Sequence, residues 1–151
     1  MVIPQLVLLS EIDRGSPLFH NCLTTLASID PQWPIERIIR SLDELKYDSL
    51  ILTDGVELMA ASCFNPGHSD GVVRVFLNFV SPGCRGNGFG AFIVAAMLRW
   101  AFDKNYNGAQ VGLGRNAKTT GILDSLCKSI EFDMRFAKIS PETGKVEFLR
   151  V

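Results

Sequence analysis

The stretch RVFLNFVSPGCRGNGFGAFIVAAMLRWAF, residues 74–102, decides the fold of this 151-residue chain. Apolar and polar positions alternate from residue 72 to 80, and this period of two predicts a strand that carries Val73, Val75, Leu77 and Phe79. The strand ends at Ser81-Pro82-Gly83, because proline has no N–H for a ladder and glycine favours a turn. Four glycines (83, 86, 88 and 90) then precede residues 91–106, which nothing interrupts and which therefore read as a long helix.

These four glycines, here called the glycine turn (residues 83–90), have three interpretations. The first is a tight strand-to-helix turn without a ligand. The second is a seat for a phosphate, because glycines let the backbone approach an anion and the first N–H groups of a helix lack internal partners. The third, a dinucleotide fingerprint, fits G-x-G-x-x-A over residues 86–91 but needs an acidic residue about 20 positions on. The next predicted strand, 109–113, ends in Gly114-Arg115 and offers no carboxylate.

The turn also resembles a known motif. Arg85-Gly86-Asn87-Gly88-Phe89-Gly90 matches [Q/R]-x-x-G-x-[G/A], which resembles the acyl-CoA motif of the Gcn-related N-acetyltransferase (GNAT) superfamily. The preceding residues, Phe79-Val80-Ser81-Pro82, resemble the strand end and proline that the family places before it. Residues 126–132, LCKSIEF, resemble a drifted form of the family's L-Y-x-x-x-G-F. The resemblance covers roughly the second half of the chain.

Length and composition place the chain among globular proteins of one domain, residues 1–151. Hydrophobic residues make up 47% of the chain. Because 15 basic residues are balanced in number by 16 acidic ones, a nucleic-acid-binding surface is not expected as the main feature. The four cysteines and two histidines show no metal-binding spacing. No stretch is long and apolar enough to predict a signal peptide or a membrane span, and we expect a cytoplasmic protein.

Local patterns predict a mixed, mostly antiparallel sheet of about six to seven strands with helices on both faces, an α/β (α+β) fold. The expected helices are residues 18–29, with Ser16 as N-cap, then 35–46, 91–106 and 119–129. The expected strands are residues 5–12, 49–53, 56–64, 72–80, 109–113, 132–139 and 145–151. The crossover through the long helix makes strand 109–113 parallel to strand 72–80.

The resemblance implies the same fold, with a central sheet that opens between its fourth and fifth strands. It implies acetyl-CoA as the cofactor, with the pantetheine arm pairing with the backbone of the fourth strand and the pyrophosphate bound in the glycine turn. The cofactor-binding residues that it implies are Phe79, Val80, Arg85, Gly86, Asn87, Gly88, Phe89, Gly90, Ala91, Asn116 and Thr120.

Catalytic candidates are less clear from the residues. The resemblance places Cys127 where the family has the tyrosine that donates to the leaving thiolate. The fourth strand carries no carboxylate to act as a general base, so the candidates are Glu57 on the preceding strand and His68 or Asp70 in the turn before it. Acidic residues on the predicted acceptor side, Asp30, Asp43, Glu44 and Asp54, would attract a cationic amine, and Trp33 and Phe64 would shape an apolar pocket or belong to the core.

The resemblance therefore implies an N-acetyltransferase that moves an acetyl group from acetyl-CoA to a primary amine of a small molecule or peptide. The alternative is a catalytically inactive module of the same fold that binds acyl-CoA or another protein. Neither hypothesis involves a metal, a nucleic acid or a membrane, and a homodimer is one assembly that both allow.

Overall fold

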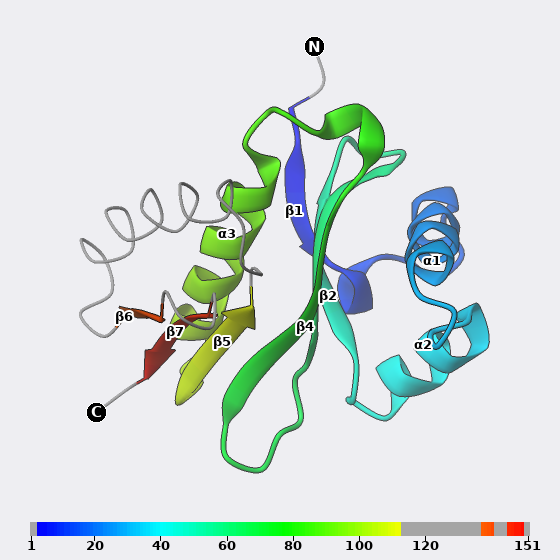
Figure 1. Cartoon of the computed structure of the whole chain (residues 1–151). Coiled ribbons are helices and arrows are strands. Elements are labelled where there is room, and N and C mark those ends of the chain that lie inside the picture. Colours follow the sequence, from blue (N-terminus) through cyan, green and yellow to red (C-terminus); the bar gives the residue numbers. More distant parts are fainter. Residues whose placement is uncertain (1–2, 113–136, 141–144, 150–151) are drawn as a thin grey trace.

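The computed structural model describes residues 3–112, 137–140 and 145–149. In these residues seven strands form one sheet in the order β1-β2-β3-β4-β5-β7-β6 (Figure 1). The strands are β1 (Gln5–Leu8), β2 (Asp48–Thr53), β3 (Leu58–Asn65), β4 (Val72–Val80), β5 (Gly108–Gly112), β6 (Ala137–Ser140) and β7 (Lys145–Leu149). The helices are α1 (Pro17–Ile29), α2 (Ile35–Asp43) and α3 (Phe89–Asp103), with short 3-10 turns at Leu9–Glu11 and Pro82–Cys84.

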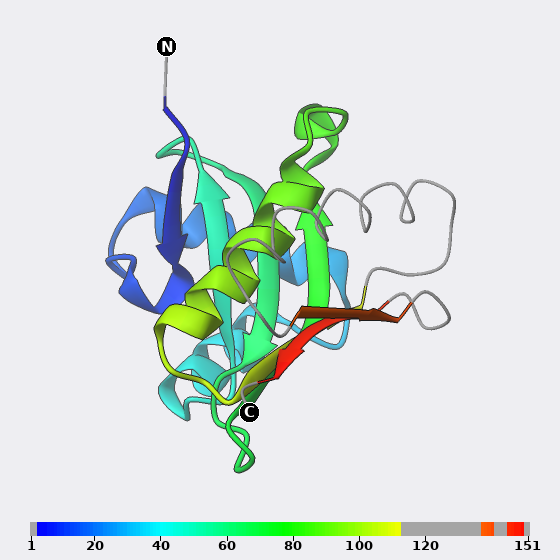
Figure 2. The ribbon, with the colours of Figure 1, turned by 90° about the vertical axis from the view of Figure 1, so that its left-hand side faces the viewer.

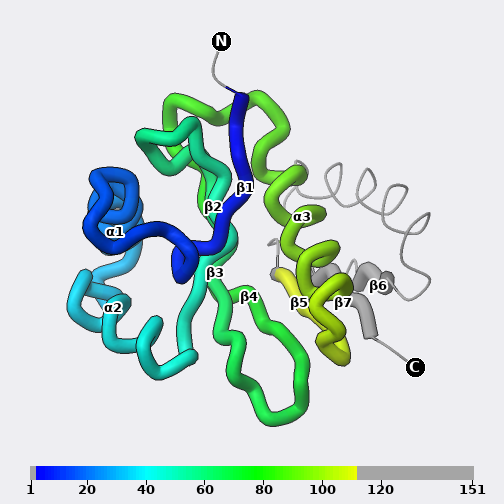
Figure 3. The backbone as a smooth tube through the Cα atoms, turned by 180° about the vertical axis from the view of Figure 1, so that it is seen from behind, coloured from blue at the N-terminus to red at the C-terminus, as the bar shows by residue number. Residues whose placement is uncertain are grey.

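Helices cover both faces of this sheet, as the sequence predicts. Figure 1 shows α1 and α2 on one side and α3 on the other, and Figure 3 shows the same three layers from behind. All strand pairs are antiparallel except β4 and β5, which run parallel as the crossover through α3 requires. The predicted mixed, mostly antiparallel sheet is therefore confirmed. No helix in the described part of the chain has both the length and the apolar character needed to cross a bilayer.

The sheet opens between β4 and β5. The two strands pair only from Val72 to Val75, opposite Gly108 to Val111, so the second half of β4 has β3 on one side and no β5 partner on the other. In Figure 2, β4 continues toward the top of the view while β5 and the pair β6 and β7 turn aside.

A β-bulge at Phe76 marks the point where the strands part. On β3, Phe64 lies opposite Val75 and its neighbour Cys63 lies opposite Leu77, which leaves Phe76 as the extra residue. A bulge bends and twists the strand that carries it. The predicted alternation along this strand is consequently interrupted: Val75 packs on the α3 side, whereas Leu77 packs on the side of α1 and α2.

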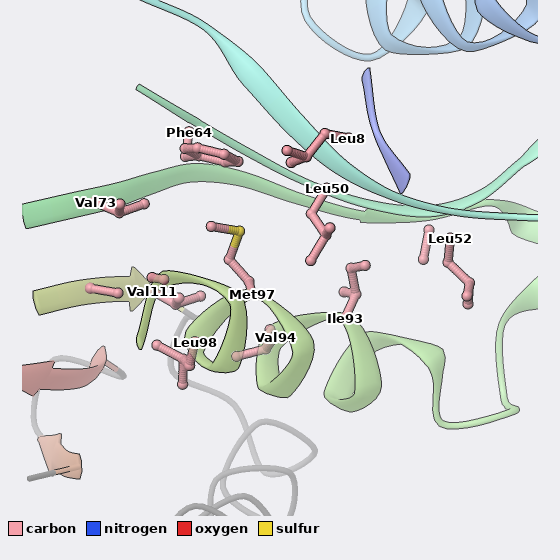
Figure 4. Close-up of a cluster of buried hydrophobic side chains, with 13 residues drawn as sticks. Leu8, Leu50, Leu52, Phe64, Val73, Ile93, Val94, Met97, Leu98 and Val111 are labelled. Carbon is pink, nitrogen blue, oxygen red and sulfur yellow. The ribbon is translucent and has the colours of Figure 1, made fainter. Parts of the chain in front are cut away.

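Two buried clusters fill the space on either side of the sheet. The α3-side cluster, shown in Figure 4, combines β-strand residues with the buried face of α3 and contains Leu8, Leu50, Leu52, Phe64, Val73, Ile93, Val94, Met97, Leu98 and Val111. The second cluster lies under α1 and α2 and includes Phe19, Leu23, Leu26, Ile38, Leu42, Tyr47 and Ile51. Burying each large side chain contributes about 1.5–3 kcal/mol, so α3 is held firmly against the strands that border the opening.

Several predicted elements end earlier than expected. The first strand stops at Leu8, because residues 9–11 form a 3-10 turn and the Asp48 carboxylate takes the Ser10 N–H at 3.1 Å. The second helix stops at Asp43 and the third at Asp103 rather than at residues 46 and 106. The predicted N-cap is confirmed, since the Phe19 N–H donates to Ser16 Oγ at 3.2 Å.

Both shortened helices end in the same backbone motif. After α2, the N–H of Lys46 donates to the Ser41 carbonyl at 2.9 Å and Leu45 adopts a left-handed φ of 57°. After α3, Asn105 takes the equivalent position with φ of 64°. Asparagine tolerates this conformation and leucine does not favour it. The predicted helix 119–129 and most of the predicted strand 132–139 lie outside the described residues.

Candidate functional site

The glycine turn begins where β4 is anchored to β3. The Ser81 N–H donates to the Met59 carbonyl at 2.9 Å, and Ser81 Oγ donates to the Leu58 carbonyl at 2.6 Å. The chain then turns through Pro82–Cys84, with the Cys84 N–H donating to the Ser81 carbonyl at 2.8 Å. The turn therefore starts from a fixed point at the end of β4.

Two of its glycines adopt backbone conformations that other residues avoid. Gly86 has φ of 85° and Gly88 has φ of 76°, both in the left-handed region. A Cβ atom added at either position would meet no atom within 4 Å. The backbone at both glycines is consequently open to anything that approaches from outside the protein.

The glycine turn leads directly into the N-terminus of α3. Gly88 is the N-cap of this 15-residue helix, and no side chain caps it. The first bond of the helix runs from the Phe92 N–H to the Gly88 carbonyl at 3.0 Å, so the N–H groups of Phe89, Gly90 and Ala91 precede it. Together with the helix dipole, they form a site that favours an anion.

A pocket of about 400 Å³ lies at this helix end. Its walls are formed by Val80, Cys84, Arg85, Gly86, Gly88, Phe89, Gly90 and Ala91. Apart from Asn87, the residues of the predicted phosphate seat therefore line one hollow. The N–H groups at the start of α3 and the one arginine are the donors that a phosphate group would need.

Arg85 and Asn87 hold the turn in shape. Arg85 Nε donates to the Val80 carbonyl at 3.2 Å, and Asn87 Nδ2 donates to the Cys84 carbonyl at 3.2 Å. Both side chains are exposed. The guanidinium of Arg85 has two further nitrogens that can donate to an anion.

The open edge of β4 continues from this pocket toward Phe76. Phe79 and Val80 are half-buried here, as residues at the border of a groove would be. Backbone groups on this edge need a partner, and a bound extended chain is one that fits them. Asn78 lies in the middle of the edge, and its Oδ1 accepts a 2.5 Å hydrogen bond from the buried Ser62 hydroxyl. Asn78 was not among the predicted site residues, although a serine inside an apolar strand signals that a polar partner lies nearby.

Glu57 lies at the same end of β4 as the glycine turn. It precedes Leu58, whose carbonyl accepts from Ser81 Oγ, and its side chain is exposed. Burial, and to a lesser extent the charge of Glu57, raises the pKa of the Cys22 thiol to about 11. Glu57 is therefore on the side of the sheet that α1 covers.

Asp70 lies at the opposite end of β4 and is fully engaged there. Its carboxylate accepts from Arg74 Nη2 at 2.7 Å and from the Val72 N–H at 3.0 Å. The hydrogen bonds from Arg74 and from the backbone lower the pKa of Asp70 to about 2, so it is a weak base at neutral pH. His68 lies in the same turn and is exposed. From Val72 to Val80 the strand spans roughly 26 Å, which separates both residues from the glycine turn.

The acidic residues that we expected to attract a cationic amine all have other partners. Asp43 pairs with Arg14 at 2.7 Å, and Glu44 pairs with Lys46 at 3.4 Å. The Asp54 carboxylate accepts two backbone N–H groups of its own turn, and Asp30 accepts the Gln32 N–H.

The two aromatic residues considered for an acceptor pocket have different environments in the structure. Phe64 is fully buried in the α3-side core against Trp100 and cannot line a pocket. Trp33 is partly exposed and does line one. Three other predicted site residues, Asn116, Thr120 and Cys127, lie outside the described residues.

Comparison with known proteins was made by sequence and by structure. No protein-family model matches this sequence, and no curated protein matches it significantly. Solved structures do match its fold. Mutant forms of the spermidine/spermine N-acetyltransferase SpeG from Vibrio cholerae superpose with a TM-score of 0.65 at 12% identity, covering 98% of this chain and 95% of theirs.

Two further structures match over their whole length. An acetyltransferase from Bacillus subtilis in complex with CoA gives a TM-score of 0.61 at 13% identity, with 99% of this chain and 100% of that one covered. Tetrahymena GCN5 gives 0.59 at 11% identity, covering 97% and 96%. Sequence identities this low show only that the backbone arrangement is shared. On that basis, this chain has the fold of the GNAT superfamily.

Proposed function

We propose that this chain is an acetyltransferase, a single domain over residues 1–151, that moves an acetyl group from acetyl-CoA to a primary amine. The observation that carries the proposal is the uncapped N-terminus of α3 beside the open edge of β4. The glycine turn would hold the pyrophosphate, and the adjoining edge would hold the pantetheine arm. Structures of the same fold, among them the Bacillus subtilis acetyltransferase, contain CoA.

The residues present fit such a ligand along its length. The N–H groups at the start of α3 and the Arg85 guanidinium would bind the phosphates. From Phe79 back to Phe76, β4 has no strand partner on its β5 side in the described part of the chain, and the backbone groups there would bond the amide groups of the arm as a neighbouring strand does. The thioester end would then lie near Asn78, in the middle of the open edge.

Acetyl-CoA supplies a thioester carbonyl; the amine nitrogen bonds to its carbon, the C–S bond breaks, and the thiolate leaves and takes up a proton. A backbone N–H of the open edge would polarise the carbonyl oxygen. The proton that the amine loses would pass to water. Glu57 is the candidate side chain to accept it at the end of β4 that leads into the glycine turn. The engagement and lowered pKa of Asp70 make it a poorer candidate.

The test is the release of CoA thiol in the presence of a panel of primary amines. We expect Arg85→Met to raise the KM for acetyl-CoA about tenfold, because a charged hydrogen bond to phosphate is lost. Arg40→Met is the control, since Arg40 is exposed on α2 and does not line the pocket at the start of α3. Thiol release that no amine stimulates, with acetyl-CoA still binding, would point to the inactive module instead.

A further inference from the structure

A second pocket, of about 390 Å³, lies on the side of the sheet that α1 and α2 cover. It sits between α2, at the lower right of Figure 1, the β3–β4 turn, at the bottom of that view, and the first half of β4, which rises from this turn. Its lining residues are Trp33, Arg37, Ser41, Lys46, Asn65, His68, Arg74 and Phe76. We call it the basic pocket.

The charge of the basic pocket is of one sign. Arg37, Lys46 and Arg74 line it together with His68, and its lining contains no carboxylate. The chain as a whole carries a net charge of −1, so this concentration of cations is local. Cations that gather around a hollow raise the local concentration of anions.

Two of these cations have acidic partners, and the third does not. Arg74 pairs with Asp70 at 2.7 Å and Lys46 pairs with Glu44 at 3.4 Å, in both cases with a carboxylate about half exposed. Both pairs are exposed to solvent and therefore screened. Arg74 donates to Asp70 from Nη1 and Nη2, which leaves its Nε–H for another anion, and the Lys46 ammonium has three donors in all.

Arg37 is held in place without a carboxylate partner in the described part of the chain. Its Cζ atom lies 4.1 Å from the centre of the Trp33 ring, and its Nη1 donates to the Gln32 carbonyl at 2.6 Å. An arginine fixed by stacking and one backbone bond is pre-organised to donate its other N–H groups.

The basic pocket adjoins the open edge of β4. Its aromatic wall is Phe76, the bulge residue, which is 46% exposed and stacks on Trp33 with ring centres 5.4 Å apart. Phe76 also marks where β4 and β5 part. Two residues of extended strand separate it from Asn78, roughly 7 Å.

We propose that the amine acceptor of this chain carries an anionic group, a carboxylate or a phosphate, which Arg37, Lys46 and Arg74 bind in the basic pocket. The inference rests on the proposed acetyl transfer and names its substrate class. The amine would reach the thioester near Asn78, while the far end of the same molecule lies between the cations and the aromatic wall. This preference is opposite in charge to that of the spermidine/spermine enzyme of similar fold, whose named substrates are polyamines.

A matched set of small amines tests the charge of the far group alone. 6-Aminohexanoate, 1-aminohexane and 1,6-diaminohexane have the same chain and differ in carrying an anion, nothing or a cation at one end. Calorimetric titration of the full chain, with and without CoA, should give the tightest binding to 6-aminohexanoate and the weakest to the diamine. The dissociation constant should rise about tenfold or more from 6-aminohexanoate to 1-aminohexane, and again from 1-aminohexane to the diamine, which is the usual effect of a charge-assisted hydrogen bond. 4-Aminobutyl phosphate then distinguishes the sources: tighter binding than 6-aminohexanoate identifies a phosphate, and weaker binding a carboxylate.

Two variants on the same helix locate the effect. Arg37→Met should reduce the preference for the anion about tenfold, because methionine keeps the apolar stem and loses the charge. Arg40→Met should leave it unchanged. If the diamine binds as tightly as 6-aminohexanoate, or if both variants behave alike, the inference is overturned.

A failure of the basic-pocket inference can be distinguished from a failure of the proposed acetyl transfer. Titration of the same protein with CoA tests the glycine turn and does not involve the basic pocket. An anion preference that persists without CoA binding would support the pocket and contradict acetyl transfer.

Discussion

Gly88 offers the sharpest test of the phosphate seat, because two nearly identical side chains differ there only in charge. Its φ of 76° is a conformation that asparagine and aspartate tolerate better than other residues with a side chain. A Cβ atom at this position meets nothing within 4 Å, so neither Gly88→Asn nor Gly88→Asp creates a clash. Both variants should therefore fold with similar stability.

The difference between them follows from Coulomb's law. The Gly88→Asp carboxylate would lie about 5 Å from a phosphate at the start of α3, and one pair of charges at that distance repels by about 3 kcal/mol at an effective dielectric constant of about 20. Calorimetry at low salt should then show acetyl-CoA binding to the Asp variant on the order of a hundred-fold more weakly than to the Asn variant. The gap should narrow as salt is added, because exposed charges are screened.

Gly83→Asp provides the control for net charge. Gly83 is in the same turn and also faces open space, but it does not line the pocket and its φ is not positive. Equal affinities of the two Gly88 variants would refute the reasoning. So would an equal loss in Gly83→Asp, since it would show a general effect of charge rather than contact with a phosphate.

Other expectations concern the fold. Leu45→Gly should raise the free energy of unfolding in urea by up to about 1 kcal/mol, since it relieves the left-handed conformation of a leucine that is 70% exposed. Asn105→Gly should change this free energy less. No gain for Leu45→Gly would contradict the assigned helix end. Phe64→Ala should lower the same quantity by about 3–5 kcal/mol, because Phe64 is fully buried, and a loss below 1 kcal/mol would place it outside the core. The lowered pKa of Asp70 means that its pairing with Arg74 stabilises the fold above pH 3.8 and that this contribution is lost as the pH falls toward about 2. Acid titrations of unfolding should therefore show a weaker pH dependence in that range for Asp70→Asn than for the unchanged protein, and identical curves would contradict the pairing.

The parts of the fold that depend on local chemistry follow from the sequence. The Ser16 cap needs only its immediate neighbours, and the structure confirms it. The glycines at residues 86 and 88 permit the left-handed conformation that the structure shows there, although the sequence did not indicate which glycines adopt it. The predicted end of α3 at residue 106 was wrong, although Asn105 is a residue type that often ends a helix in this conformation. Leu45 gives no such signal, because its strained conformation is imposed by the chain returning to the sheet.

The opening of the sheet depends on how strands pair, which one strand's sequence does not specify. The bulge at Phe76 exists because Phe64 pairs with Val75 while Cys63 pairs with Leu77. Two adjacent apolar residues, Phe76 and Leu77, hint at it, since strict alternation would put one of them on a polar face.

The candidate site likewise has one part that is continuous in the sequence and another that only the fold brings together. Arg85 and the glycines could be proposed as a phosphate seat because residues 85–91 are continuous in the sequence. The basic pocket could not be predicted in this way, since Arg37, His68 and Arg74 come from α2, the β3–β4 turn and β4, three segments that only the folded chain brings together. Of the acidic residues that we expected to attract an amine, only Asp43 has a partner from a distant segment, Arg14, which the sequence does not reveal. The partners of Asp30, Glu44 and Asp54 lie within three residues of them in the chain.

Acetyl transfer requires first of all that the glycine turn binds acyl-CoA. Calorimetric titration of the full chain with acetyl-CoA, with NAD as the control ligand, tests this most directly. We predict saturable binding of acetyl-CoA at one site per chain and no binding of NAD. The absence of acetyl-CoA binding, or equal binding of both ligands, would contradict the account.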